Sequence, residues 1–266
     1  MMELRRVARN VSDLAAASAF YSMLGFEAVG PATENAELAL ILEVERVVSL
    51  RLALGAQQLE LTKCEPEGAV YPIAAKANDI CFQHIAIVTR DIFAMHERAL
   101  RAGAVAISFQ GPQQLPAESG GAIAWKFRDP DGHPVEFLQM AERSAWNGKA
   151  LTSGYDHSAI CVRDAARSIR FYQSLGFALG HRHVNQGAAQ ARLDGLEVST
   201  VEVVAMVPAH APPHVELLAY QGDAMAGRAM RPNDIAADRM VFATPGARAV
   251  LQMDPDGHFL LLDGHN

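Results

Sequence analysis

The sequence predicts an α+β fold built from repeated strand–helix–three-strand (βαβββ) modules. The stretch Val11–Phe26 (VSDLAAASAFYSMLGF) recurs 151 residues later as Val162–Phe177 (VRDAARSIRFYQSLGF). The motif DPDGH also occurs twice, at residues 129–133 and 254–258. Similarity at fixed offsets is typical of internally repeated structures, so the two halves of the chain are related.

The spacing of the repeated motifs predicts a deletion in the second half. The tripeptide NDI at residues 78–80 recurs 155 residues later, whereas DPDGH recurs only 125 residues later. About thirty residues are therefore missing between these markers, and we expect three complete modules and a truncated fourth. The apolar pattern breaks near residues 141–151. We expect one domain over 1–145, with modules one and two, and another over 146–266, with modules three and four.

The first module shows the predicted order of elements. Residues 5–11 alternate between apolar and polar like a strand. Ser12 or Asp13 can cap a helix that runs to Leu24, and Gly25 stands where a helix favours a left-handed terminator. Strand-like runs follow at 37–44, 47–54 and 57–64.

The remaining modules follow the same order. The second module is expected to contain a strand at 82–88, a helix from Asp91 to Gly103, and a hairpin of strands 122–128 and 134–140 around the DPDGH turn. The third is expected to contain a strand from Tyr155, a helix from Asp164 to Leu175 and a last strand at 214–220. The fourth retains strands at 239–243, 248–253 and 258–263.

Composition excludes several classes of protein. The chain has 266 residues, 50% of them hydrophobic, and a net charge of -7, which is typical of a globular protein. It has no Lys/Arg cluster that could neutralise nucleic-acid phosphates. No run approaches the roughly 20 apolar residues that span a membrane, and no signal-type segment follows MMELRR, so we expect a cytoplasmic location. The three cysteines form no CxxC pair, which argues against disulfides and a Cys-based zinc site.

Two motifs give the chain a family resemblance. FYSMLGF and FYQSLGF close the first helix of each half, and DPDGH lies in the final hairpin of the even modules. This pattern resembles the vicinal oxygen chelate superfamily, which includes glyoxalase I, fosfomycin and bleomycin resistance proteins, methylmalonyl-CoA epimerase and extradiol dioxygenases. It is most similar to four-module glyoxalase-like proteins of bacteria. The resemblance implies two cupped mixed sheets with helices outside, but it does not set the reaction, because members include isomerases, lyases, oxygenases and binders.

The resemblance also implies metal ligands on the first and last strands of each module. Modules two and three match this pattern completely, with His84, Glu136, His157 and Glu216. The corresponding positions of modules one and four hold Arg6, Glu60, Arg239 and Leu261. Two His and two Glu suit one divalent ion such as Zn²⁺, Ni²⁺, Co²⁺, Mn²⁺ or Fe²⁺.

The complete ligand set requires a particular pairing of modules. If module one paired with two and three with four, neither cup would hold all four ligands. We favour pairing of two with three, which makes one cup complete and leaves one and four as a degenerate half. Arg6 and Arg239 would then form salt bridges with Glu60 or bind an anion.

The other histidines have more ordinary interpretations, with one exception. We expect His133 and His258 to satisfy turn backbone groups, and His181, His183 and His210 to lie in loops. His214 lies two residues before Glu216, and Tyr155 two residues before His157. Side chains two apart share one face of a strand, so His214 and Tyr155 are candidates to line the pocket.

Such a site predicts a metal-dependent glyoxalase I-like lyase or isomerase. A divalent ion can hold the vicinal oxygens of a small hydroxycarbonyl or hemithioacetal, and the resemblance implies that Glu136 or Glu216 is the base that yields an enediolate. One alternative is an extradiol-type ring-cleaving dioxygenase, for which His214 and Tyr155 would supply further polar groups. Another is a metal-free binder that sequesters a ligand, as bleomycin resistance proteins do. Either way, we expect a small-molecule ligand and a monomer or homodimer.

Overall fold

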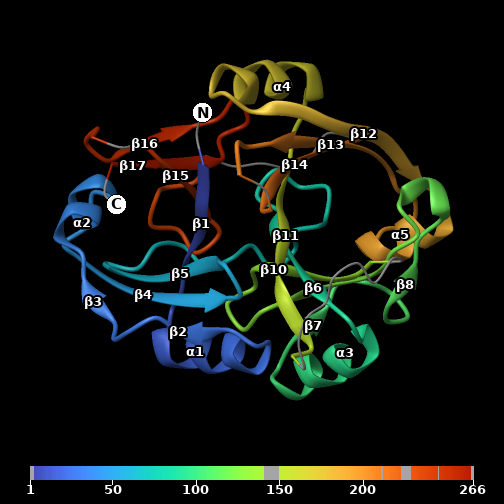
Figure 1. Cartoon of the computed structure of the whole chain (residues 1–266). Coiled ribbons are helices and arrows are strands. Elements are labelled where there is room, and N and C mark those ends of the chain that lie inside the picture. Colours follow the sequence, from blue (N-terminus) through green and yellow to red (C-terminus); the bar gives the residue numbers. More distant parts are fainter. Residues whose placement is uncertain (1–2, 141–149, 211, 223–228, 245, 265–266) are drawn as a thin grey trace.

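The computed structural model describes residues 3–140, 150–210, 212–222, 229–244 and 246–264. Within these residues the chain forms two cupped mixed sheets with helices on the outside, as the sequence predicts (Figure 1). The expected boundary near 141–151 falls mostly on residues 141–149, which lie outside the described residues. No helix in the described part of the chain is long and apolar enough to cross a membrane.

The first sheet joins the first module to the fourth. Its strands run in the order β16 (Val250–Met253), β17 (Phe259–Asp263), β15 (Arg239–Ala243), β1 (Glu3–Asn10), β5 (Gln57–Glu65), β4 (Arg46–Leu54) and β2 (Glu27–Ala28), with β3 (Thr33–Glu34) beside β4. The modules meet where β1 and β15 pair antiparallel, with Val7 opposite Met240. The described residues of the fourth module contain three strands and no helix, in agreement with the deletion.

The second sheet joins the second module to the third. Its strands run in the order β12 (Ala178–Gln186), β13 (Thr200–Val207), β14 (His214–Tyr220), β11 (Thr152–Cys161), β6 (Gln83–Thr89), β10 (Pro134–Gln139), β9 (Ile123–Arg128) and β7 (Val105–Ala106), with β8 (Gln113–Gln114) beside β9. The modules meet where β6 and β11 pair antiparallel, with Ile85 opposite Ser158. The first and last strands of modules two and three are therefore neighbours in one sheet.

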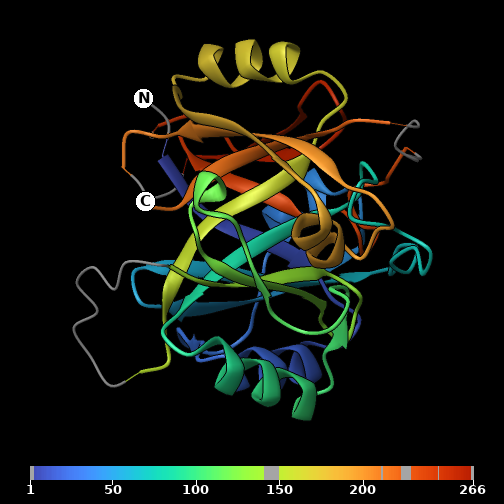
Figure 2. The ribbon, with the colours of Figure 1, turned by 90° about the vertical axis from the view of Figure 1, so that its right-hand side faces the viewer.

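Three helices begin at the aspartates that the sequence indicates. They are α1 (Leu14–Met23), α3 (Ile92–Arg101) and α4 (Ala165–Ser174), and their N-caps are Asp13, Asp91 and Asp164. Each capping carboxylate accepts a hydrogen bond from a backbone N–H of the first turn, which would otherwise lack a partner. Helices α1 and α3 lie side by side at one end of the molecule, and α4 lies at the opposite end (Figures 1 and 2).

Two sequence expectations about local structure are wrong. Residues 37–44 are not a strand, because Ala36–Ile41 form the helix α2. Asn35 caps this helix by accepting from the N–H of Leu38, and Ala and Leu favour a helix. His181 and His183 do not lie in a loop, since both belong to β12. The short helices η1 (Ala117–Ser119) and α5 (Ala188–Asp194) complete the described elements.

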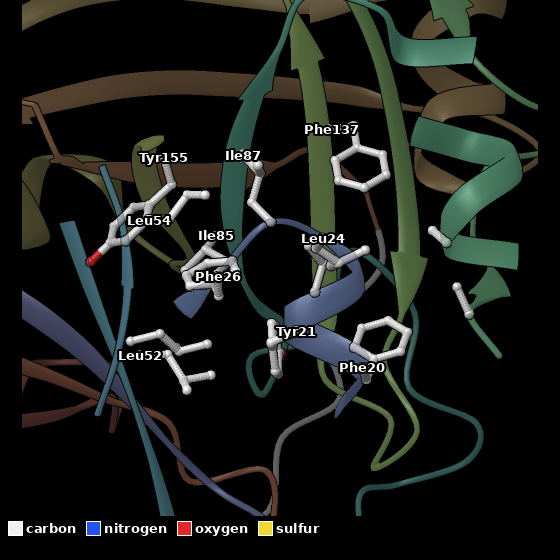
Figure 3. Close-up of a cluster of buried hydrophobic side chains, with 14 of the residues drawn as sticks. Phe20, Tyr21, Leu24, Phe26, Leu52, Leu54, Ile85, Ile87, Phe137 and Tyr155 are labelled. Carbon is white, nitrogen blue, oxygen red and sulfur yellow. The ribbon is translucent and has the colours of Figure 1, made fainter. Parts of the chain in front are cut away.

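The largest apolar cluster lies between the two sheets and is formed by side chains from both of them. In the second sheet it covers the face opposite to the candidate site. Figure 3 shows Phe20 and Tyr21 of α1 and its C-cap residue Leu24 packed with side chains from β4, β6 and β10. Ile85 and Ile87 point into this cluster from β6, and both are fully buried. Burial of one such side chain contributes about 1.5–3 kcal/mol, so these residues fix which face of β6 is turned inward. The residues that alternate with Ile85 and Ile87 along β6 must therefore point to the opposite face of the sheet.

Candidate functional site

The site begins with His84 and Glu136, which the core holds in place. His84 precedes Ile85 on β6, and Glu136 lies between Val135 and Phe137 on β10. Because Ile85, Val135 and Phe137 are buried in the apolar cluster, strand alternation turns His84 and Glu136 to the opposite face of the sheet. Both side chains line the same pocket on that face.

The other two expected ligands reach this pocket from the third module. His157 lies on β11, and Glu216 lies on β14 between Val215 and Leu217, which are buried in a second apolar cluster. Strands β11 and β14 are parallel neighbours, so both polar side chains face the pocket. The structure therefore brings together all four residues that the sequence singles out.

Short distances join the four side chains. Nε2 of His84 lies 2.8 Å from Oε2 of Glu136, and Nε2 of His157 lies 4.0 Å from that same oxygen. Nε2 of His157 also lies 3.5 Å from Oε2 of Glu216. An ion with six bonds of about 2.1 Å separates adjacent ligand atoms by about 3.0 Å and opposite ones by about 4.2 Å. These three separations fall in or close to this range, but only His84, Glu136 and His157 place their ligand atoms all within 4.8 Å of one another, so Glu216 would have to move closer to complete a set of four.

Three ring nitrogens of the cluster lack hydrogen bonds, and one of them is Nδ1 of His84. Nε2 of His84 and Nε2 of His157 are buried, and neither makes a hydrogen bond to any residue that the structure describes. The 2.8 Å contact of His84 with Glu136 is not aligned as a hydrogen bond. Buried polar atoms without partners cost free energy unless something absent from the chain satisfies them. This donor set therefore fits a divalent metal ion.

The pKa values of His84, Glu136 and Glu216 agree with that chemistry, whereas that of His157 favours a proton that a metal would have to displace. Burial lowers the pKa of His84 to about 4, so its ring is neutral and offers a lone pair. Burial alone would raise the pKa of Glu136, but Lys126 and His84 lower it, and the histidines around Glu216 hold the pKa of that carboxyl well below its usual range. Burial opposes protonation of His157, yet Glu216 and Asp156 raise its pKa to about 9. Without a metal, His157 therefore binds a proton at neutral pH.

Tyr155 does not line the pocket, contrary to the expectation from its spacing. The register of β11 against β6 shifts between Tyr155 and His157. The step from Tyr155 to His157 covers two residues of β11 but only one residue of β6. This β-bulge turns Tyr155 toward the apolar cluster between the sheets, where its hydroxyl donates to the backbone oxygen of Gln58 (Figure 3). A pocket role for Tyr155 is therefore wrong.

The same bulge brings Asp156 to the pocket, a residue that the sequence did not indicate. Oδ2 of Asp156 lies 3.0 Å from Nδ1 of His157 and 3.8 Å from Nδ1 of His214. His214 in turn places Nε2 3.4 Å from Oε1 of Glu216. His214 therefore lies next to the cluster, but it is not among the described residues that line the pocket, contrary to the expectation from its position two residues before Glu216.

The pocket that contains the cluster has a volume of about 360 Å³. Its remaining walls are mostly apolar and include Leu115, Leu138, Leu193, Val203 and Leu218. Lys126 is the one Lys or Arg among the described residues that line it.

Lys126 is held by an acid from the opposite wall. Its Nζ lies 2.7 Å from Oδ1 of Asp194, and both side chains are buried. Gln190 and Ser199 donate to the other oxygen of Asp194. The sequence carried a signal for Lys126, because it lies directly opposite Glu136 across the DPDGH hairpin.

The corresponding positions of modules one and four form no similar cluster. Arg6 forms a salt bridge of 2.5 Å with Glu60, as expected, and a second of 3.0 Å with Asp263. Arg239 instead donates to Oδ1 of Asn10. The first sheet thus has the guanidinium groups of Arg6 and Arg239 at the positions where the second sheet has His84 and His157.

The turn histidines have structural roles, but their rings contact backbone groups of a neighbouring module rather than of the turn itself. Nε2 of His133 lies 2.8 Å from the backbone oxygen of Asn10, and Nε2 of His258 lies 2.7 Å from that of Cys161. Each ring therefore ties a DPDGH hairpin to a neighbouring module.

Comparisons with known proteins agree with this architecture. No curated protein matches the chain. A variant of glyoxalase I from Zea mays is 17% identical, with a TM-score of 0.63 over 99% of this chain and 93% of that one. A candidate dioxygenase from Bacillus subtilis is 10% identical, with a TM-score of 0.62 over 99% and 86%. Identities this low show the fold alone.

A family model identifies the chain more directly. The model described as Glyoxalase/Bleomycin resistance protein/Dioxygenase superfamily matches residues 3–137 and 154–258. The two matched ranges are the two related halves of the sequence, and together they cover most of the chain. The protein belongs to the glyoxalase/bleomycin resistance protein/dioxygenase superfamily.

Proposed function

We propose that the protein is a metal-dependent lyase or isomerase of the glyoxalase I type, which acts on a small hydroxycarbonyl compound. The observation that carries the proposal is the convergence of His84, Glu136, His157 and Glu216 in one pocket, where the buried Nε2 atoms of both histidines lack hydrogen bonds. These four side chains would hold one divalent ion. The ion would supply Lewis-acid polarisation of two vicinal substrate oxygens.

The chain itself would supply the proton transfer. Glu136 and Glu216 are both ionised at neutral pH, because neighbouring cationic groups lower the pKa of each. One of them would accept the proton from the carbon beside the carbonyl group and return it to the adjacent carbon. The apolar walls would exclude water from the enediolate between the two transfers.

The pocket favours a small uncharged substrate over a glutathione adduct. Glutathione carries two carboxylates, which would need cationic partners. The only Lys or Arg among the described lining residues is Lys126, and Asp194 already neutralises it. A hydroxycarbonyl compound needs only the vicinal oxygens and apolar contact, which this pocket offers.

Two other functions in the superfamily gain less support. A ring-cleaving dioxygenase would use two His and one carboxylate on Fe²⁺, and a second carboxylate would occupy a position that catechol and O₂ need. Tyr155, which could assist it, points into the core. A metal-free binder would leave the buried Nε2 atoms of His84 and His157 without partners.

Activity assays separate these functions. Protein loaded with Zn²⁺, Ni²⁺ or Co²⁺ should isomerise the adduct of methylglyoxal with 2-mercaptoethanol, followed by the absorbance of the thioester. Glu136→Gln or Glu216→Gln should lower kcat by about 10²–10⁴-fold in the variant that lacks the base. Oxygen uptake with catechol by the Fe²⁺-loaded protein, with no isomerisation of any thiol adduct, would support the dioxygenase instead.

A further inference from the structure

Glu216 faces a second group of ligand atoms on the side away from His157. Its Oε2 lies 3.5 Å from Nε2 of His157, whereas its Oε1 lies 3.4 Å from Nε2 of His214 and 3.5 Å from Nε2 of His181. The two oxygens of one carboxylate therefore contact different histidines. The ligand atoms of His181, His214 and Glu216 all lie within 4.8 Å of one another.

His214 makes a hydrogen bond of 3.4 Å to Glu216, and this contact and that of His181 with Glu216 are both long enough to be edges of a metal coordination shell. An N–H···O bond in a protein usually spans about 2.7–3.2 Å, so contacts of 3.4 and 3.5 Å are long. Four ligands at about 2.0–2.1 Å from a tetrahedral ion lie about 3.4 Å apart. Both measured distances match the edge of such a tetrahedron.

Asp156 lies between the two groups and makes a hydrogen bond with His157. Its Oδ2 lies 3.0 Å from Nδ1 of His157 and 3.8 Å from Nδ1 of His214. A carboxylate that faces Nδ1 favours a proton on that nitrogen, which leaves the lone pair on Nε2. Protein metal sites commonly use a carboxylate in this way behind a histidine ligand. Asp156 thus turns Nε2 of His157 toward Oε2 of Glu216, while Nε2 of His214 faces Oε1.

We propose that His181, His214 and Oε1 of Glu216 form a second divalent-cation site, which shares Glu216 with the site of His84, Glu136 and His157. This inference rests on the proposed function, because Glu216 would bridge the two ions. Two nitrogen donors and one carboxylate suit Zn²⁺ or a similar first-row ion, with the fourth position left to water. Ions bridged in this way lie about 3.5–4 Å apart.

The second site is open to solvent, unlike the first. His181 exposes 53% of its side chain, whereas the side chain of His84 is 2% exposed. His214 and Glu216 are 12% and 13% exposed. An ion could therefore enter and leave the second site more easily, and we expect it to bind more weakly than the ion in the buried site.

A metal titration tests this proposal. Metal-free protein is titrated with Co²⁺, followed by visible absorption, and the bound metal is then measured by elemental analysis after gel filtration. Wild-type protein should bind about two ions per chain in two steps. His181→Ala and the double variant His181→Ala/His214→Ala should bind about one, in the tighter step. His181 is exposed, so the single variant does not depend on tolerance of a buried substitution.

His183→Ala is the matched control. The rings of His181 and His183 lie 5.2 Å apart, but His183 is not part of the proposed triad. This variant should still bind about two ions, which separates a specific site from loose binding by surface imidazoles.

Three results would count against the second site in different ways. Saturation of wild type and of the His181 variants at about one ion would overturn the second site and leave the first intact. Loss of both ions from folded His181→Ala/His214→Ala would assign these histidines to the first site. Failure of wild type to bind any ion would overturn the proposed function as well.

Discussion

Oδ2 of Asp156 lies 3.0 Å from Nδ1 of His157, and this contact fixes which ring nitrogen of His157 faces Glu216. A carboxylate accepts hydrogen bonds, so Nδ1 must donate. Nε2 then points into the pocket, where a neutral ring offers its lone pair. The orientation depends on the β-bulge, since a regular strand would turn Asp156 to the opposite face from His157.

Removal of the Asp156 carboxylate should weaken metal binding. In Asp156→Ala, the ring of His157 loses the acceptor that fixes its orientation, and we expect the affinity for Zn²⁺ to fall about 10–100-fold. Competition with a chromophoric chelator measures this. Glu202→Gln on β13, whose carboxylate pairs with Arg182 instead, should leave the affinity unchanged. Equal affinity in wild type and Asp156→Ala would show that this contact does not support a metal site.

Lys126 should be important for stability. Lys126→Met leaves the buried carboxylate of Asp194 without its cation, and we expect the free energy of unfolding to fall by about 3–5 kcal/mol. Urea denaturation measures the change. Lys126→Met/Asp194→Leu removes both charges and should recover part of the loss. Arg182→Ala breaks an exposed pair and should have little effect. A Lys126→Met variant as stable as wild type would show that Asp194 does not need the charge of Lys126.

His133 should make stability depend on pH. Its Nδ1 lies 2.9 Å from Oδ1 of Asp238 in an ion-pair contact, and its Nε2 lies 2.8 Å from the backbone oxygen of Asn10, so a doubly protonated ring faces an acceptor on each side. Burial and Arg9 oppose this charge, but Asp238 and Asp129 raise the pKa of His133 above its ordinary value of 6.5. A raised pKa in the folded state stabilises the fold fully below the unfolded pKa and loses that effect as pH rises through the folded pKa.

The difference in unfolding free energy between wild type and His133→Gln should therefore be larger at pH 6 than at pH 9. Chemical denaturation at both pH values measures it. His96→Gln on α3 is the control, since burial lowers the pKa of His96 and no such decrease is expected. A difference that is constant or increases toward pH 9 would show that His133 is neutral in the fold.

Asp164 should stabilise the start of α4. Its Oδ1 accepts from the N–H of Arg167, and Asp164→Ala leaves this donor without a partner inside the chain. We expect a loss of about 1 kcal/mol in the free energy of unfolding, measured by denaturation. Asp164→Ser retains an acceptor and should be close to wild type. If both substitutions have the same effect, the cap does not act through this hydrogen bond.

Strand alternation explains how much of the site the sequence could predict. His84, Glu136 and Glu216 each stand beside apolar residues that must face a core, so their own direction follows from the period of two. The aspartates that cap α1, α3 and α4 mark the start of each helix and fix the register of the strands before them. Both signals are local, and both are confirmed.

The wrong or missed predictions concern features that the pattern of apolar and polar residues in a short segment does not reveal. A bulge between Tyr155 and His157 reverses the face of Tyr155 and brings Asp156 into the pocket, and no residue type in the sequence indicates it. Residues 37–44 are apolar enough for a strand, but Asn35 caps them as a helix. His181 belongs to a strand because β12 pairs with β13, a contact between distant residues. Lys126 could have been found, since the hairpin register sets it opposite Glu136.

The central claim is that His84 and His157 hold a metal ion. The most direct test is the metal content of metal-free protein after incubation with Zn²⁺ and gel filtration, compared between wild type and His84→Ala/His157→Ala. We expect the double variant to bind about one ion fewer per chain, while His96→Ala matches wild type. Equal metal content in wild type and the double variant, or no uptake by wild type of Zn²⁺, Ni²⁺ or Fe²⁺, would contradict the claim.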